Sequence, residues 1–371
     1  MIPVNEPLLA GRELEYVTDA VGSGWISSAG SYLTRFEEAW AEYCGRRHGV
    51  AVSNGTVALQ LAVEALGLGP GDEVVLPSFT ILSCVTAVLA AGATPVLVDA
   101  DPETWCLDLD QVEARLGPRT RAVMPVHIYG HPVEMGRLLP LVERRGIAVI
   151  EDAAEAHGAQ VEVGAVWRRC GSFGELSTFS FYANKLVTTG EGGMVLTDSD
   201  ELAGRARSLR NLAFGARRRF VHEELGHNFR LTNLQAAIGL AQVERIDVVV
   251  ERKREVARRY LAGLAGLPLR LPVERPWARN VYWMFGVVLD EGTGLDAESF
   301  AALLHAEGVE TRPFFFGMHE QPALLRRGLF AGERHPVTEA ISRRGLYLPS
   351  GVALRDEQVD EVVAAVRRVL A

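Results

Sequence analysis

Residues 48–98 read HGVAVSNGTVALQLAVEALGLGPGDEVVLPSFTILSCVTAVLAAGATPVLV, and this stretch decides the fold. Three short apolar runs, at 48–52, 73–76 and 95–98, are typical of buried strands. Two longer runs between them, at 56–66 and 81–91, are typical of helices, and the first ends at the glycine-rich turn 67–71. Strands that alternate with helices predict an α/β fold with a mainly parallel sheet covered on both faces.

The same alternation continues on both sides of this stretch. We expect a helix at 33–44 and further strands at 122–126 and 147–150. Residues 232–264 predict a long helix, with or without a kink, that leads into a smaller α+β domain. The best strand of that domain is 282–289 and its best helix is 297–306. We therefore divide the chain into a large domain, 1–250, and a small C-terminal domain, 251–371.

Composition excludes several classes of function. The chain has 371 residues, 48% of them hydrophobic, which is enough for a large core. The net charge of −9 argues against a nucleic-acid or anionic-membrane partner, and we interpret the short basic run Arg217–Arg219 as a solvated loop. The sequence shows no signal peptide or membrane span, and its four cysteines lack metal-site spacing. We expect a cytoplasmic protein without a metal.

The distribution of lysine is unusual. Only two of the 38 basic residues are lysines, Lys185 and Lys253. A guanidinium stays protonated and cannot become an imine at neutral pH, so a lysine kept amid this bias indicates a need for an amine. Lys253 lies in a charged helical segment, where we expect an ordinary surface charge. Lys185 lies between apolar residues and a glycine turn, although a structural role would explain that position equally well.

Three segments carry groups that fit one cofactor. Ser53-Asn54-Gly55-Thr56 lies between a strand and a helix, where backbone N–H groups and the helix dipole bind phosphate, although these residues are also common N-caps. Asp152 follows an apolar strand, where it can keep a pyridine nitrogen protonated or cap the next turn. Lys185 follows Thr178 and Ser180 on a predicted strand. Together they predict pyridoxal phosphate, held as a Schiff base by Lys185, which would also carry the proton.

Six motifs along the chain allow a comparison with known families. They are Ser53-Asn-Gly-Thr56, Pro77-Ser-Phe-Thr80, Pro125-Val-His-Ile-Tyr-Gly130, Glu151-Asp-Ala-Ala-Glu-Ala-His-Gly158, Ser180-Phe-Tyr-Ala-Asn-Lys185 and Gly190-Glu-Gly-Gly-Met194. With them the chain resembles the DegT-type nucleotide-sugar aminotransferases, a family of fold-type I pyridoxal enzymes. The resemblance implies amino transfer from glutamate to a nucleotide-linked keto-sugar, by a homodimer with shared active sites.

The resemblance also implies cofactor contacts at the matching positions. Lys185 would carry the Schiff base, Asp152 would pair with the pyridine nitrogen, and Phe79 would stack on the ring. Glu155 would contact the ring hydroxyl at a position that is glutamine in many members, and a carboxylate there would need a proton or a cationic neighbour. The phosphate would be held by Gly55, Thr56 and Ser180, and by Asn228 from the neighbouring subunit.

Two segments, 222–242 and 312–322, resemble members that aminate C4 of GDP-4-keto-6-deoxymannose. We therefore expect substrate contacts from Arg230, Arg312, Phe314 and His319. The alternative for Phe314 and the two phenylalanines that follow it is a place in the core, since consecutive residues cannot all face one way.

Other functions remain open at this point. An aminotransferase acting on a dTDP-keto-sugar, a 3-keto sugar or an aminocyclitol precursor would share most of these motifs. A related dehydratase is disfavoured because such enzymes replace the lysine with histidine, whereas this chain has Lys185. A non-catalytic regulator is disfavoured by the intact Lys185 and Asp152 and by the lack of a basic helix-turn-helix segment.

Overall fold

A computed structural model describes residues 1–215, 220–222 and 224–371. The basic run Arg217–Arg219, which we interpreted as a solvated loop, lies outside the described residues. Within the described ranges, the central sheet has the strand order β1-β9-β8-β5-β4-β2-β3. Its strands are β1 (His48–Val52), β2 (Glu73–Pro77), β3 (Thr94–Val98), β4 (Thr120–Val123), β5 (Ala148–Asp152), β8 (Leu176–Ser180) and β9 (Gly193–Thr197).

The predicted mainly parallel sheet is confirmed. Only β9 runs against its neighbours β1 and β8, and the other adjacent pairs of this sheet are parallel. Most residues of these strands are buried, because helices cover the sheet, and this is why the strands appear in the sequence as apolar runs. The strand expected at 122–126 is shifted, since β4 ends at Val123.

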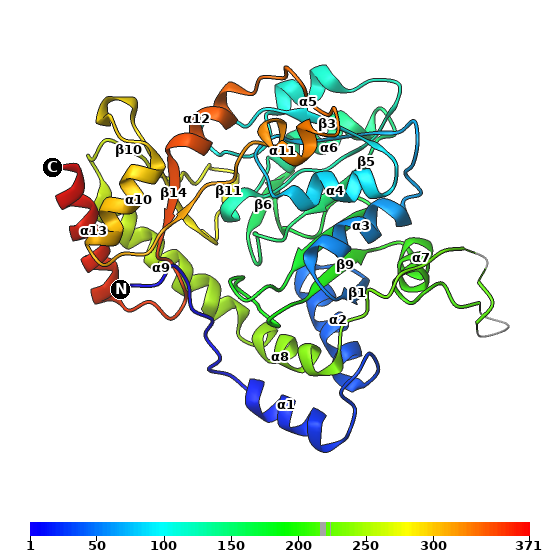
Figure 1. Ribbon diagram of the computed structural model, residues 1–371. Coiled ribbons are helices and arrows are strands. Elements are labelled where there is room, and N and C mark those ends of the chain that lie inside the picture. Colours follow the sequence, from blue (N-terminus) through cyan, green and yellow to red (C-terminus); the bar gives the residue numbers. More distant parts are fainter. Residues whose placement is uncertain (216–219, 223) are drawn as a thin grey trace.

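Helices of the first two-thirds of the chain pack around this sheet (Figure 1). Asn54 caps one of them by accepting a hydrogen bond from the Val57 N–H at 3.0 Å. The helices are α1 (Glu13–Gly22), α2 (Ser31–Cys44), α3 (Gly55–Ala65), α4 (Leu82–Ala90), α5 (Leu109–Arg115), α6 (Met135–Glu143), α7 (Asp200–Arg210) and α8 (Asn233–Val243). The outermost of them in Figure 1, α1, packs on α8.

The last third of the chain forms an antiparallel sheet with helices. Its strand order is β10-β12-β14-β13, from β10 (Leu269–Arg270), β12 (Phe285–Leu289), β13 (Arg312–Pro313) and β14 (Gly345–Leu348). The helices are α9 (Ile246–Leu264), α10 (Ala297–Ala306), α11 (Pro322–Leu325), α12 (Pro336–Arg344) and α13 (Asp356–Leu370). A small sheet joins this part to the large one, with β11 (Ala278–Arg279) beside the hairpin of β6 (Gln160–Val163) and β7 (Val166–Arg169).

Helix α9 connects two apolar cores. The segment that we expected as one long helix is broken after Val243, so that α8 and α9 are separate helices. Val249 packs in the core of the large sheet, whereas Val256 and Tyr260 pack in the core of the small sheet. The proposed division at residue 250 therefore falls inside one helix, where the chain passes from one core to the other.

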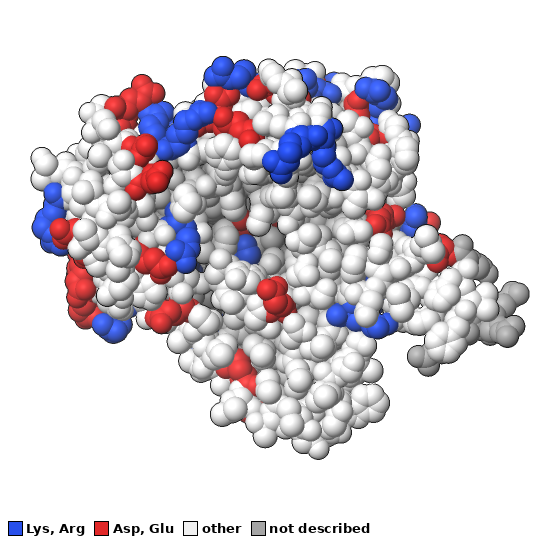
Figure 2. Space-filling view, viewed as in Figure 1, with Lys and Arg blue, Asp and Glu red and all other residues white. Residues whose placement is uncertain are grey.

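Among the described residues, the face drawn in Figure 2 has no large patch of a single charge that would indicate a strongly charged partner. Figure 2 shows acidic and basic side chains interspersed on one face, which is hollowed between the part that carries β14 and α13 and the part that carries the central sheet. None of the helices in the described ranges is both long and apolar enough to span a bilayer. Each of the four cysteines is buried and unpaired.

Candidate active site

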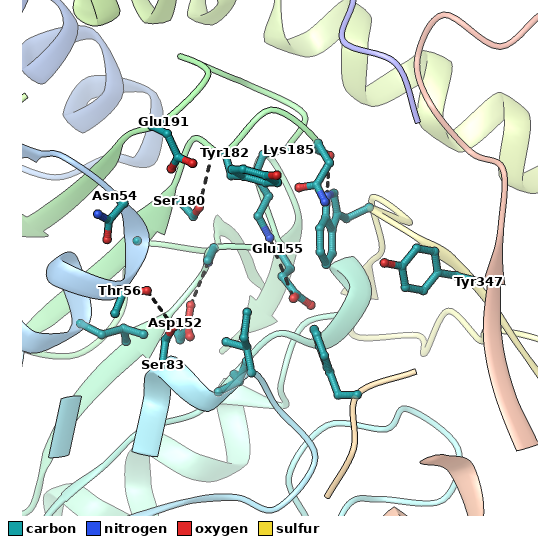
Figure 3. Close-up of a pocket in the computed structure, with 18 residues that line it drawn as sticks. Asn54, Thr56, Ser83, Asp152, Glu155, Ser180, Tyr182, Lys185, Glu191 and Tyr347 are labelled. Atoms are coloured by element: carbon teal, nitrogen blue, oxygen red, sulfur yellow. Dashed lines mark hydrogen bonds and ion pairs between the residues drawn. The ribbon is translucent and has the colours of Figure 1, made fainter. Parts of the chain in front are cut away.

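A pocket of about 360 Å³ opens at the carboxyl ends of β5 and β8, beside the first turn of α3 (Figure 3). Ligands of open α/β sheets bind at this edge, because the loops that follow the strands diverge there. Six of the predicted cofactor residues line the pocket: Gly55, Thr56, Asp152, Glu155, Ser180 and Lys185. Trp283, Phe315 and Tyr347, from the last third of the chain, close the other side.

One end of the pocket is built for an anion. A Cβ atom on Gly55 would lie 2.6 Å from Cβ of Ser180, so only glycine lets the start of α3 approach the end of β8 this closely. The hydroxyl of Thr56 lies 2.7 Å from that of Ser83, and Figure 3 shows both hydroxyls together with Ser180 around the same space. Hydroxyls and the N-terminus of a helix together suit a phosphate group.

Asp152 is the last residue of β5 and is 2% exposed. Its carboxylate accepts hydrogen bonds from the Ala154 N–H at 3.0 Å and from the Cys84 thiol at 3.3 Å. Burial raises the pKa of Asp152, and no described cation lies within ion-pair distance of its oxygens. A buried carboxylate of this kind favours a cationic partner such as a protonated ring nitrogen.

The neighbouring Glu151 faces the opposite side of β5 and fixes the end of the strand. It accepts hydrogen bonds from the N–H groups of Gly171 at 2.6 Å and Phe173 at 2.9 Å, and from the His127 ring at 2.8 Å. The Nδ1 atom of that ring accepts from the Val133 N–H, so Nε2 carries the proton. Every oxygen of Glu151 thus has a partner, and the group acts as a structural anchor beneath Asp152.

Lys185 and Glu155 form the polar pair of the pocket. The Nζ atom of Lys185 lies 3.9 Å from a carboxylate oxygen of Glu155, and both side chains are largely buried (Figure 3). Burial lowers the pKa of Lys185 and raises that of Glu155 to about 7. Glu155 also accepts a hydrogen bond from the Tyr129 N–H at 2.8 Å. Glu155 thus has a basic neighbour in Lys185, and its own raised pKa favours a proton on the carboxylate.

Trp283 is a pocket residue that the sequence analysis missed. Its ring centroid lies 3.4 Å from Nζ of Lys185, and its Nε1–H donates to the Asn184 carbonyl at 2.8 Å. We had expected a strand from residue 282, but β12 begins at Phe285 and the preceding residues form the loop that carries this indole. The other lining residues that we missed include Ser83, Tyr182, Asn184, Glu191 and Tyr347.

Three predicted aromatic or imidazole contacts lie outside the pocket lining. Phe79 is fully buried, with ring centroids 5.7 and 5.8 Å from those of Phe314 and Phe315. Phe314 is also buried, 4.8 Å from the Tyr129 ring, and it is Phe315 that reaches the pocket. His319 is buried in a separate depression, 3.4 Å from Glu339. Phe314 follows the end of β13 and is buried, which agrees with the alternative of a place in the core, and its contact with the substrate stays a prediction.

Three further predicted residues are absent from the lining of the pocket of their own chain. Asn228 is exposed and pairs with Asn211 in an isolated bridge, and Arg230 donates to the Asn211 side chain at 2.6 Å. Arg312 is exposed and forms an ion pair with Glu310 at 2.7 Å. None of the three lines the pocket of the described chain.

The groups present fit pyridoxal phosphate. An anion cradle at Gly55 and Thr56, a buried acid at Asp152 and a buried amine at Lys185 match its phosphate, ring nitrogen and aldehyde. Apolar and aromatic side chains line much of the remaining wall, as a flat ring requires.

Known proteins are similar to this chain over nearly its whole length. Residues 7–367 match the model of the DegT/DnrJ/EryC1/StrS aminotransferase family. The chain is 43% identical to the GDP-perosamine synthase of Caulobacter vibrioides, covering 100% of this chain and 98% of that protein. It is 39% identical to the GDP-perosamine synthase of Vibrio cholerae, with 99% and 98% covered. The solved structure of S. venezuelae DesV in complex with a ketimine intermediate is 38% identical, with a TM-score of 0.88 over 97% of this chain and 94% of that one.

Proposed function

The chain belongs to the DegT/DnrJ/EryC1/StrS aminotransferase family and uses pyridoxal phosphate, and we propose that it transfers the amino group of L-glutamate to C4 of GDP-4-keto-6-deoxy-D-mannose. The product would be GDP-perosamine. The observation that carries amino transfer is the buried amine of Lys185 in one pocket with Asp152. The choice of sugar is supported by the full-length similarity to two GDP-perosamine synthases.

Each polar group of the pocket has a part in this reaction. When bound, pyridoxal phosphate supplies a carbon that carries the amino group and a ring that withdraws electrons. Gly55, Thr56 and Ser180 hold the phosphate, and Asp152 keeps the ring nitrogen protonated. The Nζ atom of Lys185 takes up and returns the proton that moves during amino transfer.

Glu155 and the aromatic side chains of the pocket affect the protonation of Lys185. Glu155, 3.9 Å away, favours the protonated amine by its charge, while burial favours the neutral amine. The charge of Glu155 thus opposes the effect of burial, which lowers the pKa of Lys185. Trp283, Phe315 and Tyr347 form an aromatic wall on the other side of the pocket, which reduces the contact of Lys185 with water.

The substrate assignment predicts a measurable preference. With L-glutamate as donor, kcat/KM for GDP-4-keto-6-deoxymannose should exceed that for dTDP-4-keto-6-deoxyglucose by at least about tenfold, which corresponds to about 1.4 kcal/mol of transition-state binding. Both sugars are assayed side by side, with the amino-sugar product identified by mass spectrometry. A clear preference for the dTDP sugar would overturn this choice of sugar and leave amino transfer intact.

We also propose a cytoplasmic homodimer in which Asn228 serves the phosphate of the neighbouring subunit. The four free cysteines suit a reducing compartment, and the exposed Asn228 has no place in the pocket of its own chain. Under subunit exchange, Lys185→Ala and Asn228→Ala proteins should restore activity to about a quarter of the wild-type level, because one site of each mixed dimer is intact. With each parent inactive and exchange verified by native mass spectrometry, failure to complement would contradict the shared site.

A further inference from the structure

Both lysines of the chain contact Trp283. We expected Lys253 to be an ordinary surface charge, but it is 3% exposed, because it lies on the face of α9 that also buries Val249, Val256 and Tyr260. Its Nζ atom donates to the carbonyl of Trp283 at 2.9 Å and to the carbonyl of Ser350. The carbonyl of Trp283 is thus held by one lysine while its ring meets the other.

The site of Lys253 suits a lysine and not an arginine. Its described acceptors are two backbone carbonyls, without a carboxylate, and burial lowers the pKa of Lys253 to about 7. A compact ammonium with three donors can serve two carbonyls from a buried helix. A guanidinium would bring five donors and leave several of them unpaired.

The loop that carries Trp283 is constrained on both sides of the residue. Tyr282 has a φ of 50°, a left-handed conformation that is strained for a residue with a side chain. Its N–H donates to Asn280 Oδ1 at 2.7 Å. The Nε1–H of Trp283 is held by Asn184, the residue next to Lys185. Together with the hydrogen bond from Lys253 to the Trp283 carbonyl, these bonds fix the indole face against the Lys185 amine.

We propose that Trp283 sets the proton affinity of Lys185 through the face of its ring, and that Lys253 is the positioning residue that holds Trp283 in place. The inference rests on the proposed function only in taking Lys185 as the amine that moves the proton. An ammonium near an indole face is stabilised relative to the neutral amine. The other titratable groups that act on Lys185 are Glu155 and Asp152, both of which favour its protonated form, and the buried His157 lies near it as well.

The presence of only two lysines permits a direct test. In cofactor-free, full-length protein labelled with ¹³C at the lysine ε carbon, NMR should show two lysine signals, and the Lys253→Met variant assigns them. Replacing tryptophan by fluorinated tryptophans weakens the negative ring face at almost constant size. We expect the pKa of Lys185 to fall stepwise with fluorination, by about 0.5–1 unit in total.

The positioning role is tested by repeating the fluorine series in variants. Lys253→Met should abolish most of the fluorine effect on Lys185, and Lys253→Gln, which keeps a neutral amide donor group in place of the ammonium, should retain part of it. Tyr260→Phe is the matched control, because Tyr260 also anchors α9, through the Pro349 carbonyl at 2.7 Å, without touching Trp283. It should keep the full effect.

Two results would overturn the inference. The first is a Lys185 pKa that does not change with fluorination, and the second is a shift of that pKa in Lys253→Gln as large as in the wild type. Either result is independent of the sugar, since no substrate is present. If the titrations behave as expected and no amino sugar is formed from glutamate, the proposed function fails and this inference stands.

Discussion

The Lys185→Arg protein is expected to fold and to bind pyridoxal phosphate, but to lose amino transfer by about 10²–10⁴-fold, the contribution of a positioned proton-transfer group. Arginine keeps the positive charge beside Glu155, so the electrostatics of the pocket change little. Its guanidinium stays protonated, however, and can neither accept the proton nor bond covalently to the cofactor. Single-turnover reaction with L-glutamate measures the loss.

Covalent attachment gives an independent reading of the same substitution. Borohydride reduction followed by peptide mass spectrometry should place the cofactor on Lys185 in the wild type and on no residue in Lys185→Arg. Lys253 is an internal control, because it remains in both proteins and is buried away from the pocket. Turnover near the wild-type rate in Lys185→Arg would contradict the role of this amine.

The parts of the fold that were predictable are those decided by local pattern. The strand expected at 48–52 and the helix expected at 297–306 have these bounds in β1 and α10. Their apolar runs are buried, and Asp296 caps the helix by accepting from the Ser299 N–H at 2.8 Å. The break between α8 and α9 was harder to place, since neither glycine nor proline marks it.

The part of the site that lies on the large sheet could also be predicted from the sequence. Asp152 and Ser180 end parallel neighbours, β5 and β8, so their side chains had to meet at one edge. The opposite wall could not be predicted, because Trp283 and Tyr347 reach the pocket only through the packing of the last third of the chain on the rest. The periodicity of apolar residues within one helix or strand carries no information on that packing. For the same reason, the sequence predicts a surface charge at Lys253.

The second large effect is expected at Asp152. Asp152→Asn should lower kcat by at least about a hundredfold, because the fixed charge that stabilises a protonated ring nitrogen is removed from a buried site. In the cofactor-free protein the same substitution should raise stability, since it removes a buried carboxylate that no described cation pairs. In thermal unfolding, the cofactor-free protein should therefore be more stable with asparagine at position 152, and the cofactor-loaded protein should be more stable with aspartate.

The stability difference between the two cofactor-free proteins should also depend on pH. Burial raises the pKa of Asp152 in the folded, cofactor-free chain above its value in the unfolded chain, so the contribution of this group to stability is lost as pH rises through the folded pKa. Asparagine does not titrate, so the advantage of Asp152→Asn should grow as pH rises from the unfolded pKa of an aspartate, about 3.9, through the raised folded pKa.

Asp99→Asn is the matched control for this prediction. Asp99 is a buried carboxylate too, 3% exposed, but it accepts hydrogen bonds from the N–H groups of Val337 and Thr338, both at 2.9 Å, and from the Thr338 hydroxyl at 2.8 Å. Its replacement should destabilise the loaded and cofactor-free proteins alike, since an amide cannot accept all of these bonds. If Asp152→Asn also destabilised both forms equally, Asp152 would be a structural carboxylate like Asp99, and its assignment to the ring nitrogen would be wrong.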